Sequence, residues 1–396
     1  MGIVQYNTAD VENFGDVLYP VVLKKFACEC RTEVLDHYAF LGGQAPMGAG
    51  YVTKPINDLF RQAGPRETIV VGGGDIIRLD DDVMAGHYHA FFEKPTTNFA
   101  RRDYWSPPQK SPLKLFQEKM MPPMHGAFLL SHENCPRAEA TAYFSVGVPF
   151  DFGEKQHSLV RSVFNLAKYI YVRDRISAEK LKKTGISSHI VVAPDFLIGI
   201  SKYFEKSRLR QQAESLQLTA DHDPKNPYLC FQISVAGMNH LGIIGSALRD
   251  FSRRQGLKVL LLPLGFCHHD REVLQKFSAM SGSEFKFVNV STIEQMLAVI
   301  AHAAMFVGIS MHGNIVARSY GVPHLFGPLP GVDKIQGAME MLRARPVHRL
   351  DRWDGLTPAL DALADVSPDE LIATSQRAFS ESVDAARAMM QAISDH

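Results

Sequence analysis

The fold is decided by residues 305–323, which read Met-Phe-Val-Gly-Ile-Ser-Met-His-Gly-Asn-Ile-Val-Ala-Arg-Ser-Tyr-Gly-Val-Pro. Residues 305–309 form an apolar run with the length of a buried strand, and residues 315–320 have the pattern of a helix that ends at Gly321. The small and polar residues between them predict a turn whose free backbone N–H groups and helix dipole favour an anion. His312 lies in that turn, where it could donate to an anion, transfer a proton or simply cap the helix.

The composition excludes several classes of protein. At 396 residues the chain is too long for one ordinary hydrophobic core, which predicts two domains. Lys and Arg total 42, as do Asp and Glu, so no overall field would attract nucleic acid or an anionic membrane. No apolar run approaches the roughly 20 residues of a membrane span, and the N-terminus lacks the features of a signal peptide. We therefore expect a cytoplasmic protein with no transmembrane segment and no nucleic-acid partner.

Apolar runs of strand length alternate with helical patterns along most of the chain. They occur at residues 2–6, 69–71, 143–146, 169–172, 189–192, 228–233, 258–263, 285–288, 305–309 and 324–326. A polar break near residues 221–224 indicates a domain boundary between two such units. The pattern predicts an α/β protein with two Rossmann-like domains that face each other across a cleft, as in the GT-B architecture.

We expect three parts: residues 1–222 form an N-terminal domain, residues 223–366 a C-terminal domain, and residues 367–396 a helix that packs on the body. Residues 79–136 of the first domain are an insertion in which Pro, His and aromatic residues mix with Lys and Arg. Such an insertion is often a lid or a specificity surface. Its aromatic residues could stack on sugar rings or equally form a satellite core; they include Tyr88, Phe91, Tyr104 and Trp105.

Polar residues follow several predicted strands at their carboxyl ends, where open parallel sheets place ligands. Asn13 and Asp16 follow the first strand and could cap a helix or bind a hydroxyl-rich ligand. Arg173, Arg175 and Asp195 follow two later strands and could bind a ligand or form structural ion pairs.

Two further segments bear on the site. The glycines before Asp75 allow either a tight turn or a close approach to a ligand. The sequence Cys267-His268-His269-Asp270 is rich in metal-ligand types, but adjacent residues project in different directions and no second ligand cluster is visible. We therefore expect no metal site, and we expect His269 or Asp270 to line the cleft.

Several motifs occur in order over residues 1–340. They are Asn13-Phe14-Gly15-Asp16, Gly72-Gly73-Gly74-Asp75, Val172-Arg173-Asp174, Pro194-Asp195, Ser310-Met311-His312-Gly313, Gly321-Val322-Pro323 and Asp333-Lys334. In order and spacing they resemble the polysaccharide pyruvyl transferase family. That resemblance implies a GT-B-like fold and transfer of a pyruvyl group from phosphoenolpyruvate to a sugar, usually as a ketal that bridges two hydroxyls of a surface polysaccharide or exopolysaccharide.

The resemblance also implies roles for particular residues. His312 is the candidate for donor binding and proton transfer, and Asp16 or Asp195 for the base. Residues expected to bind substrate are Asn13, Gly73, Gly74, Arg173, Arg175, Ser310, Gly313, Asn314 and Lys334. Phosphoenolpyruvate would be a co-substrate, with no cofactor. The acceptor, a free or lipid-linked sugar or oligosaccharide, is expected on the N-terminal domain and the donor on the C-terminal domain; a homodimer is compatible with the composition.

The chain departs from the family pattern at one position. Members often carry Arg-Leu-His where this chain has Ser310-Met311-His312, and a serine hydroxyl cannot replace a bidentate guanidinium. Arg175 and Arg318 are the candidate substitutes. Two other functions stay open: a GT-B glycosyltransferase that uses a nucleotide sugar, and a family member without catalytic activity that serves in binding or assembly.

Overall fold

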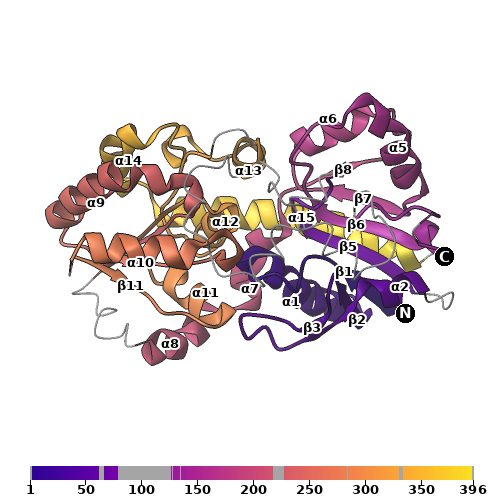
Figure 1. Cartoon of the computed structure of the whole chain (residues 1–396), viewed down its shortest axis with the longest axis horizontal. Coiled ribbons are helices and arrows are strands. Elements are labelled where there is room, and N and C mark those ends of the chain that lie inside the picture. Colours follow the sequence, from indigo (N-terminus) through magenta and orange to yellow (C-terminus); the bar gives the residue numbers. More distant parts are fainter. Residues whose placement is uncertain are drawn as a thin grey trace, which may run out of the picture.

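The computed structural model describes residues 2–61, 67–78, 126, 128–133, 135–216, 227–282, 284–329 and 333–394. Two mainly parallel sheets, each flanked by helices, lie side by side (Figure 1). The predicted α/β architecture with two Rossmann-like domains is therefore confirmed. The predicted boundary after residue 222 lies outside the described residues, as do the four aromatic residues named for the insertion. None of the helices in the described part of the chain has the length and apolar character of a membrane span.

The first sheet has eight strands in the order β3-β4-β2-β1-β5-β6-β7-β8. They are β1 (Gly2–Tyr6), β2 (Glu33–Ala39), β3 (Gly43–Gln44), β4 (Val52–Pro55), β5 (Thr68–Gly74), β6 (Thr141–Val146), β7 (Tyr169–Val172) and β8 (Val191–Val192). Only the pair of β3 with β4 is antiparallel among these described strands. The strand order reverses at β1, so the loops after β1 and β5 part there and open a crevice.

The helices of the first domain are α1 (Phe14–Glu29), α2 (Ile56–Arg61), α5 (His157–Leu166) and α6 (Arg175–Lys183). Helix α1 follows β1 directly, and its apolar residues include Val17, Leu18, Val22 and Phe26, all buried in the core. The N-terminus of α1 lies at the crevice, since the helix follows β1. Asn13 caps it there by accepting a hydrogen bond from the Gly15 N–H at 3.1 Å.

The second sheet has five parallel strands in the order β11-β10-β9-β12-β13. They are β9 (Tyr228–Gln232), β10 (Lys258–Leu261), β11 (Phe285–Phe287), β12 (Met305–Gly308) and β13 (His324–Phe326). The helices are α9 (Leu241–Gln255), α10 (Asp270–Met280), α11 (Ile293–Ala301), α12 (Met311–Ser319), α13 (Lys334–Met341) and α14 (Leu356–Ala364). Here the strand order reverses between β9 and β12, so the turn predicted after residue 309 lies at a second point of reversal, or switch point. Helix α12 begins four residues earlier than predicted, because Ser310 caps it.

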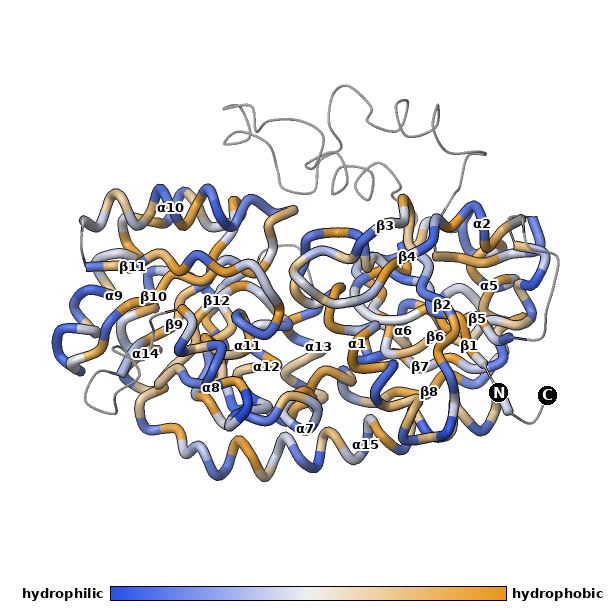
Figure 2. Tube along the Cα trace, turned by 90° about the horizontal axis from the view of Figure 1, so that it is seen from below, coloured by the Kyte–Doolittle hydropathy of each residue, from blue (hydrophilic) through white to orange (hydrophobic). Residues whose placement is uncertain are grey.

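Two segments join the domains. Helices α7 (Ile200–Tyr203) and α8 (Lys206–Ser215) follow the first sheet, and α8 packs on α11 of the second domain. Helix α15 (Pro368–Ser394) runs along one side of the molecule beneath both domains (Figure 2). It contacts β6 and β7 in the first domain and α12 in the second. The loops after β1 and β10 also meet, since the Phe14 N–H donates to the Leu264 carbonyl at 2.9 Å. The two crevices therefore face each other.

Candidate functional site

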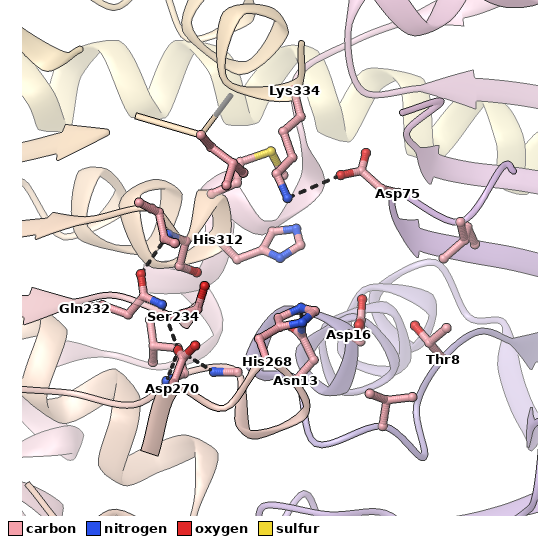
Figure 3. A pocket seen from close by; sticks show the side chains of 18 of the residues that line it. Thr8, Asn13, Asp16, Asp75, Gln232, Ser234, His268, Asp270, His312 and Lys334 are labelled. Atoms are coloured by element: carbon pink, nitrogen blue, oxygen red, sulfur yellow. Dashed lines mark hydrogen bonds and ion pairs between the residues drawn. The ribbon is translucent and has the colours of Figure 1, made fainter. Parts of the chain in front are cut away.

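A cleft lies where the two crevices meet, and its polar lining comes from both domains (Figure 3). The first domain contributes Thr8, Asn13, Asp16, Asp75 and Arg78, and the second contributes Gln232, Ser234, His268, Asp270, Ser310, His312 and Lys334. Most of these residues follow the carboxyl ends of strands at the two switch points, which is where doubly wound sheets bind ligands.

The start of α12 forms one wall of the cleft. Ser310 accepts a hydrogen bond from the Gly313 N–H at 3.1 Å, and its own N–H donates to Gln232 Oε1 at 2.8 Å. Asn314 is buried and donates from Nδ2 to two carbonyls of the same turn, at 2.8 and 2.9 Å. Gly313 and Asn314 thus shape the turn. The first N–H groups of a helix have no intrahelical acceptor, and the cap occupies that of Gly313, so those of Met311 and His312 are the ones available to an anion.

His312 extends from α12 of the second domain to α1 of the first. A β-carbon added at Gly15 would lie only 1.7 Å from His312 Nδ1, so the imidazole occupies space that a side chain at position 15 would need. On its other side, Nε2 lies 3.6 Å from Asp195 Oδ2. The ring also meets the Tyr19 ring edge to face, with centroids 5.7 Å apart. These contacts hold the imidazole at the boundary between the domains.

Asp195 lies behind His312 and is buried. Its Oδ2 accepts a hydrogen bond from the Tyr19 hydroxyl at 2.6 Å and lies 3.4 Å from Arg173 Nη1. Burial favours the neutral acid, but the neighbouring His312 and Arg173 outweigh it and hold the pKa of Asp195 below its ordinary value. Asp195 is therefore an ionised group that contacts His312 without lining the cleft.

Arg173 is also buried and forms ion pairs with Asp75 and Asp195. Lys334 approaches Asp75 from the second domain, with Nζ 3.7 Å from Oδ2. Although burial favours the neutral acid, Arg173 and Lys334 lower the pKa of Asp75. Burial lowers the pKa of Lys334. Arg78 lines the same cleft and stacks over the Phe150 ring at 5.3 Å, so this end of the site carries two cations beside one carboxylate.

Two other carboxyl groups of the lining are perturbed in the opposite direction. Burial among protein atoms raises the pKa of Asp16, in the first turn of α1, to about 6. Burial also raises the pKa of Asp270, the first residue of α10, to about 7. Such groups can exchange protons near neutral pH, which is what acid–base catalysis requires.

A family model for polysaccharide pyruvyl transferase matches residues 13–326, which span both crevices and the turn at His312. The chain belongs to the polysaccharide pyruvyl transferase family. The predicted family assignment is thereby confirmed. No curated protein matches the chain by sequence.

Solved structures with a similar fold include a trehalose 6-phosphate synthase and a UDP-GlcNAc 2-epimerase. The trehalose 6-phosphate synthase of Burkholderia multivorans aligns with a TM-score of 0.52 at 11% identity, covering 100% of this chain and 97% of that one. The UDP-GlcNAc 2-epimerase of Methanocaldococcus jannaschii aligns with a TM-score of 0.51 at 11% identity, covering 93% of each chain. At such low identity the likeness shows a GT-B-like fold alone.

Five of the site residues predicted for this pyruvyl transferase family member line the cleft: Asn13, Asp16, Ser310, His312 and Lys334. The others lie outside that lining: Gly73, Gly74, Arg173, Arg175, Asp195, Gly313 and Asn314. The two glycines have a steric explanation. A β-carbon at Gly73 would lie 2.1 Å from the Tyr19 ring, and one at Gly74 would lie 2.9 Å from Asp16 Oδ1. Both also have positive φ angles, which favour glycine.

Neither arginine suggested in place of the family arginine lies in the cleft. Arg175 is exposed at the start of α6. Arg318 is buried on another face of α12, where Nη2 donates to the Leu342 carbonyl at 3.0 Å and to Thr374 Oγ1 at 2.9 Å. Neither residue is placed to contact a ligand in the described lining of the cleft. The only arginine in the described lining is Arg78, which the sequence did not single out.

The residue pattern 267–270 contributes to the cleft in a way that was partly predicted. Asp270 lines it as expected, but the histidine that does so is His268 rather than His269. His268 Nε2 lies 3.2 Å from Asn13 Nδ2, another contact between the domains. Among the residues that the structure describes, no group of three or more His, Cys, Asp or Glu is placed to hold a metal ion.

Proposed function

We propose that this protein transfers a pyruvyl group from phosphoenolpyruvate to sugar hydroxyls as a ketal, in the cytoplasmic synthesis of a surface polysaccharide or exopolysaccharide. Family membership supports a transferase of polysaccharide biosynthesis. The observation that carries the donor assignment is the convergence of Arg78, Lys334, His312 and the start of α12 on one cleft. Phosphoenolpyruvate carries a phosphate and a carboxylate, and such groups favour cations and helix N-termini.

Arg78 resolves the conflict with the family pattern in this proposal. Serine at position 310 caps α12 and cannot grip an anion with two parallel hydrogen bonds. Arg78 follows β5 of the first domain and offers a guanidinium to the cleft from the opposite side. We therefore assign it, with Lys334, to the anionic groups of the donor.

The proposed reaction has a defined proton balance. An acid protonates the methylene carbon of phosphoenolpyruvate, which leaves positive charge on C2. One sugar hydroxyl adds to C2 and loses its proton, and the bond from C2 to the phosphate oxygen then breaks. The second hydroxyl adds to C2 and also loses its proton, which gives the cyclic ketal and inorganic phosphate. One of the two released protons replaces the proton taken up by the methylene carbon, and the other leaves on the phosphate. Nearby cations offset the charge on the departing phosphate.

His312 is the group that we assign to proton transfer at the methylene carbon, because it lines the cleft beside the start of α12. Asp195 is better suited to orienting His312 than to acting as the base, since it is buried behind the imidazole. Asp16 is left as the base. With a pKa raised to about 6 by burial, it is mostly ionised at neutral pH and still basic enough to accept a hydroxyl proton.

The test is ligand-dependent stability of the purified protein, because a ligand of the native state stabilises it by mass action. Phosphoenolpyruvate at 100 times its Kd should add about 2.7 kcal/mol to the free energy of unfolding. His312→Ala should abolish this gain, whereas His189→Ala, which changes an exposed histidine, should keep it. Stabilisation by UDP or GDP sugars alone would instead indicate glycosyl transfer. No stabilisation by either ligand would favour a member without catalytic activity.

A further inference from the structure

Asp270 has no part in the mechanism above, yet it lines the cleft from the second domain. The residue is only 1% exposed. Its Oδ2 accepts three hydrogen bonds, from Gln232 Nε2 at 2.7 Å, the Gly265 N–H at 2.9 Å and the Leu264 N–H at 3.1 Å. Its Oδ1 is buried and accepts none from the described residues. The two oxygens of one carboxyl group are therefore in very different situations.

A purely structural role does not account for this difference. Closing the turn at Leu264 and Gly265 requires only the oxygen that accepts the three hydrogen bonds. The second buried oxygen is left without a donor, and an unpaired buried acceptor destabilises the fold. Buried polar atoms in native proteins are mostly paired, so an unpaired acceptor on a side chain that lines a cleft is a candidate to accept a hydrogen bond from a ligand.

Gln232 fixes Asp270 relative to the donor end of the cleft (Figure 3). Its Oε1 accepts from the Ser310 N–H at 2.8 Å while its Nε2 donates to Asp270 Oδ2 at 2.7 Å. Rotating the amide would break both hydrogen bonds, so its orientation is determined. A ligand that binds Asp270 therefore has a fixed position relative to the start of α12 and to His312.

The surroundings of Asp270 suit a hydroxyl group better than an anion. The cations Arg78 and Lys334 act on Asp75, at the other end of the cleft, and both lower its pKa. Burial raises the pKa of Asp270, and so does the neighbouring Glu272, whose charge would repel an anion. Ser234 and His268, which also line the cleft, supply further hydrogen-bonding groups.

We propose that Asp270 Oδ1 is a binding site for a hydroxyl group of the sugar acceptor. This inference rests on the proposed pyruvyl transfer, and it specifies where the acceptor is held. The hydroxyl donates to Oδ1, and the link through Gln232 sets the sugar against the donor. The second domain then contacts both substrates, whereas the sequence had suggested that the acceptor lies on the first domain.

Asp270→Asn tests this inference with little change to the fold. The amide oxygen can replace Oδ2 and accept the same three hydrogen bonds, while an NH2 group replaces Oδ1. The position that faces the ligand then donates and no longer accepts. Turning this acceptor into a donor leaves the sugar hydroxyl without its partner, which weakens binding by roughly ten- to a hundredfold. Asp354→Asn, which alters an exposed carboxylate paired with Arg352, is the matched control.

The measurement is saturation-transfer NMR with methyl galactoside, methyl glucoside and methyl mannoside on protein saturated with phosphoenolpyruvate. We expect at least one sugar to bind the wild type and Asp354→Asn, and to bind Asp270→Asn at least about tenfold more weakly. Equal binding to Asp270→Asn would overturn the proposal, and so would failure of all three sugars to bind the wild type. His268→Ala, which leaves the carboxyl group in place, provides a second variant of the same wall and should also weaken binding.

Calorimetry with phosphoenolpyruvate separates the two proposals. Asp270→Asn should bind phosphoenolpyruvate as the wild type does, because the donor end of the cleft is unchanged. If the wild type does not bind phosphoenolpyruvate, the proposed function fails. The sugar titrations of the unliganded protein then still decide whether Asp270 binds a hydroxyl group.

Discussion

Replacing Gly15 by alanine should disable the site while leaving the fold intact. The added β-carbon would lie 1.7 Å from His312 Nδ1 and 2.5 Å from the ring atoms Cγ and Cε1. Non-bonded heavy atoms need about 3.5 Å, so the imidazole must move by roughly 2 Å. That movement would disturb the contact between His312 and Asp195.

Gly15→Ala should affect activity more than stability. A misplacement of about 1 Å can cost roughly a hundredfold in rate, so Gly15→Ala should lower kcat/KM by at least that factor, equivalent to about 2.7 kcal/mol of transition-state stabilisation. The backbone at Gly15 is not in the left-handed region, and in a helix alanine is favoured over glycine by about 1 kcal/mol. Helix propensity thus offsets part of the steric strain.

The assay is release of inorganic phosphate from phosphoenolpyruvate in the presence of an acceptor sugar, together with thermal unfolding. Gly242→Ala is the matched control, because it also lies in a helix and a β-carbon there would have no neighbour within 4 Å. It should keep full activity and its stability should not fall. A folded Gly15→Ala protein with wild-type kcat/KM would refute the assignment of catalysis to His312 at this position.

Three further substitutions test the charges of the site. Because burial raises the pKa of Asp16 to about 6, wild-type kcat/KM should rise between pH 5 and 7 as the base ionises; Asp16→Asn should lose this rise, and an unchanged profile would exclude Asp16 as the base. Arg173→Leu removes the buried partner of two carboxylates and should lower the free energy of unfolding, measured in urea, by about 3–5 kcal/mol. The control Arg352→Ala, at an exposed ion pair, should not shift the midpoint of urea unfolding. Burial raises the pKa of Asp270 from 3.8 to about 7, so the native state favours the neutral acid, and wild-type stability should fall by up to about 4 kcal/mol as pH rises through that range. Melting temperatures measured from pH 5 to 8 should therefore increasingly favour Asp270→Asn over the wild type. A difference that stays constant with pH would contradict the argument.

The organising turn could be predicted because its signals are local. A strand pattern and a helix pattern lie within residues 305–323, and the structure has β12 and α12 there, although the cap is Ser310 and not His312. Strand β2 was not predicted, because Glu33, Asp36 and His37 interrupt its apolar residues. Its burial is uneven along its length, so the alternation that would reveal a strand is weak.

The membership of the site could be predicted only in part, because it depends on strand order and side-chain direction. Arg78 reaches the cleft because β5 lies beside β1 at the switch point, and no local pattern gives that order. Arg318 is six residues after His312, and at 100° per residue it points about 120° away around the helix. It packs toward α15 instead. Asp195 contacts His312 but does not itself line the cleft, and sequence spacing cannot distinguish these two placements.

Helix α15 has a consequence for how the protein is made. It covers β6 and β7 of the first domain, yet it is encoded roughly 200 residues after them. At 5–20 residues per second the ribosome needs about 10–40 s to synthesise that interval. During this time the growing first domain leaves the apolar surface beneath α15 open to chaperones and to neighbouring nascent chains. Completion of the first domain therefore waits for the last helix of the chain.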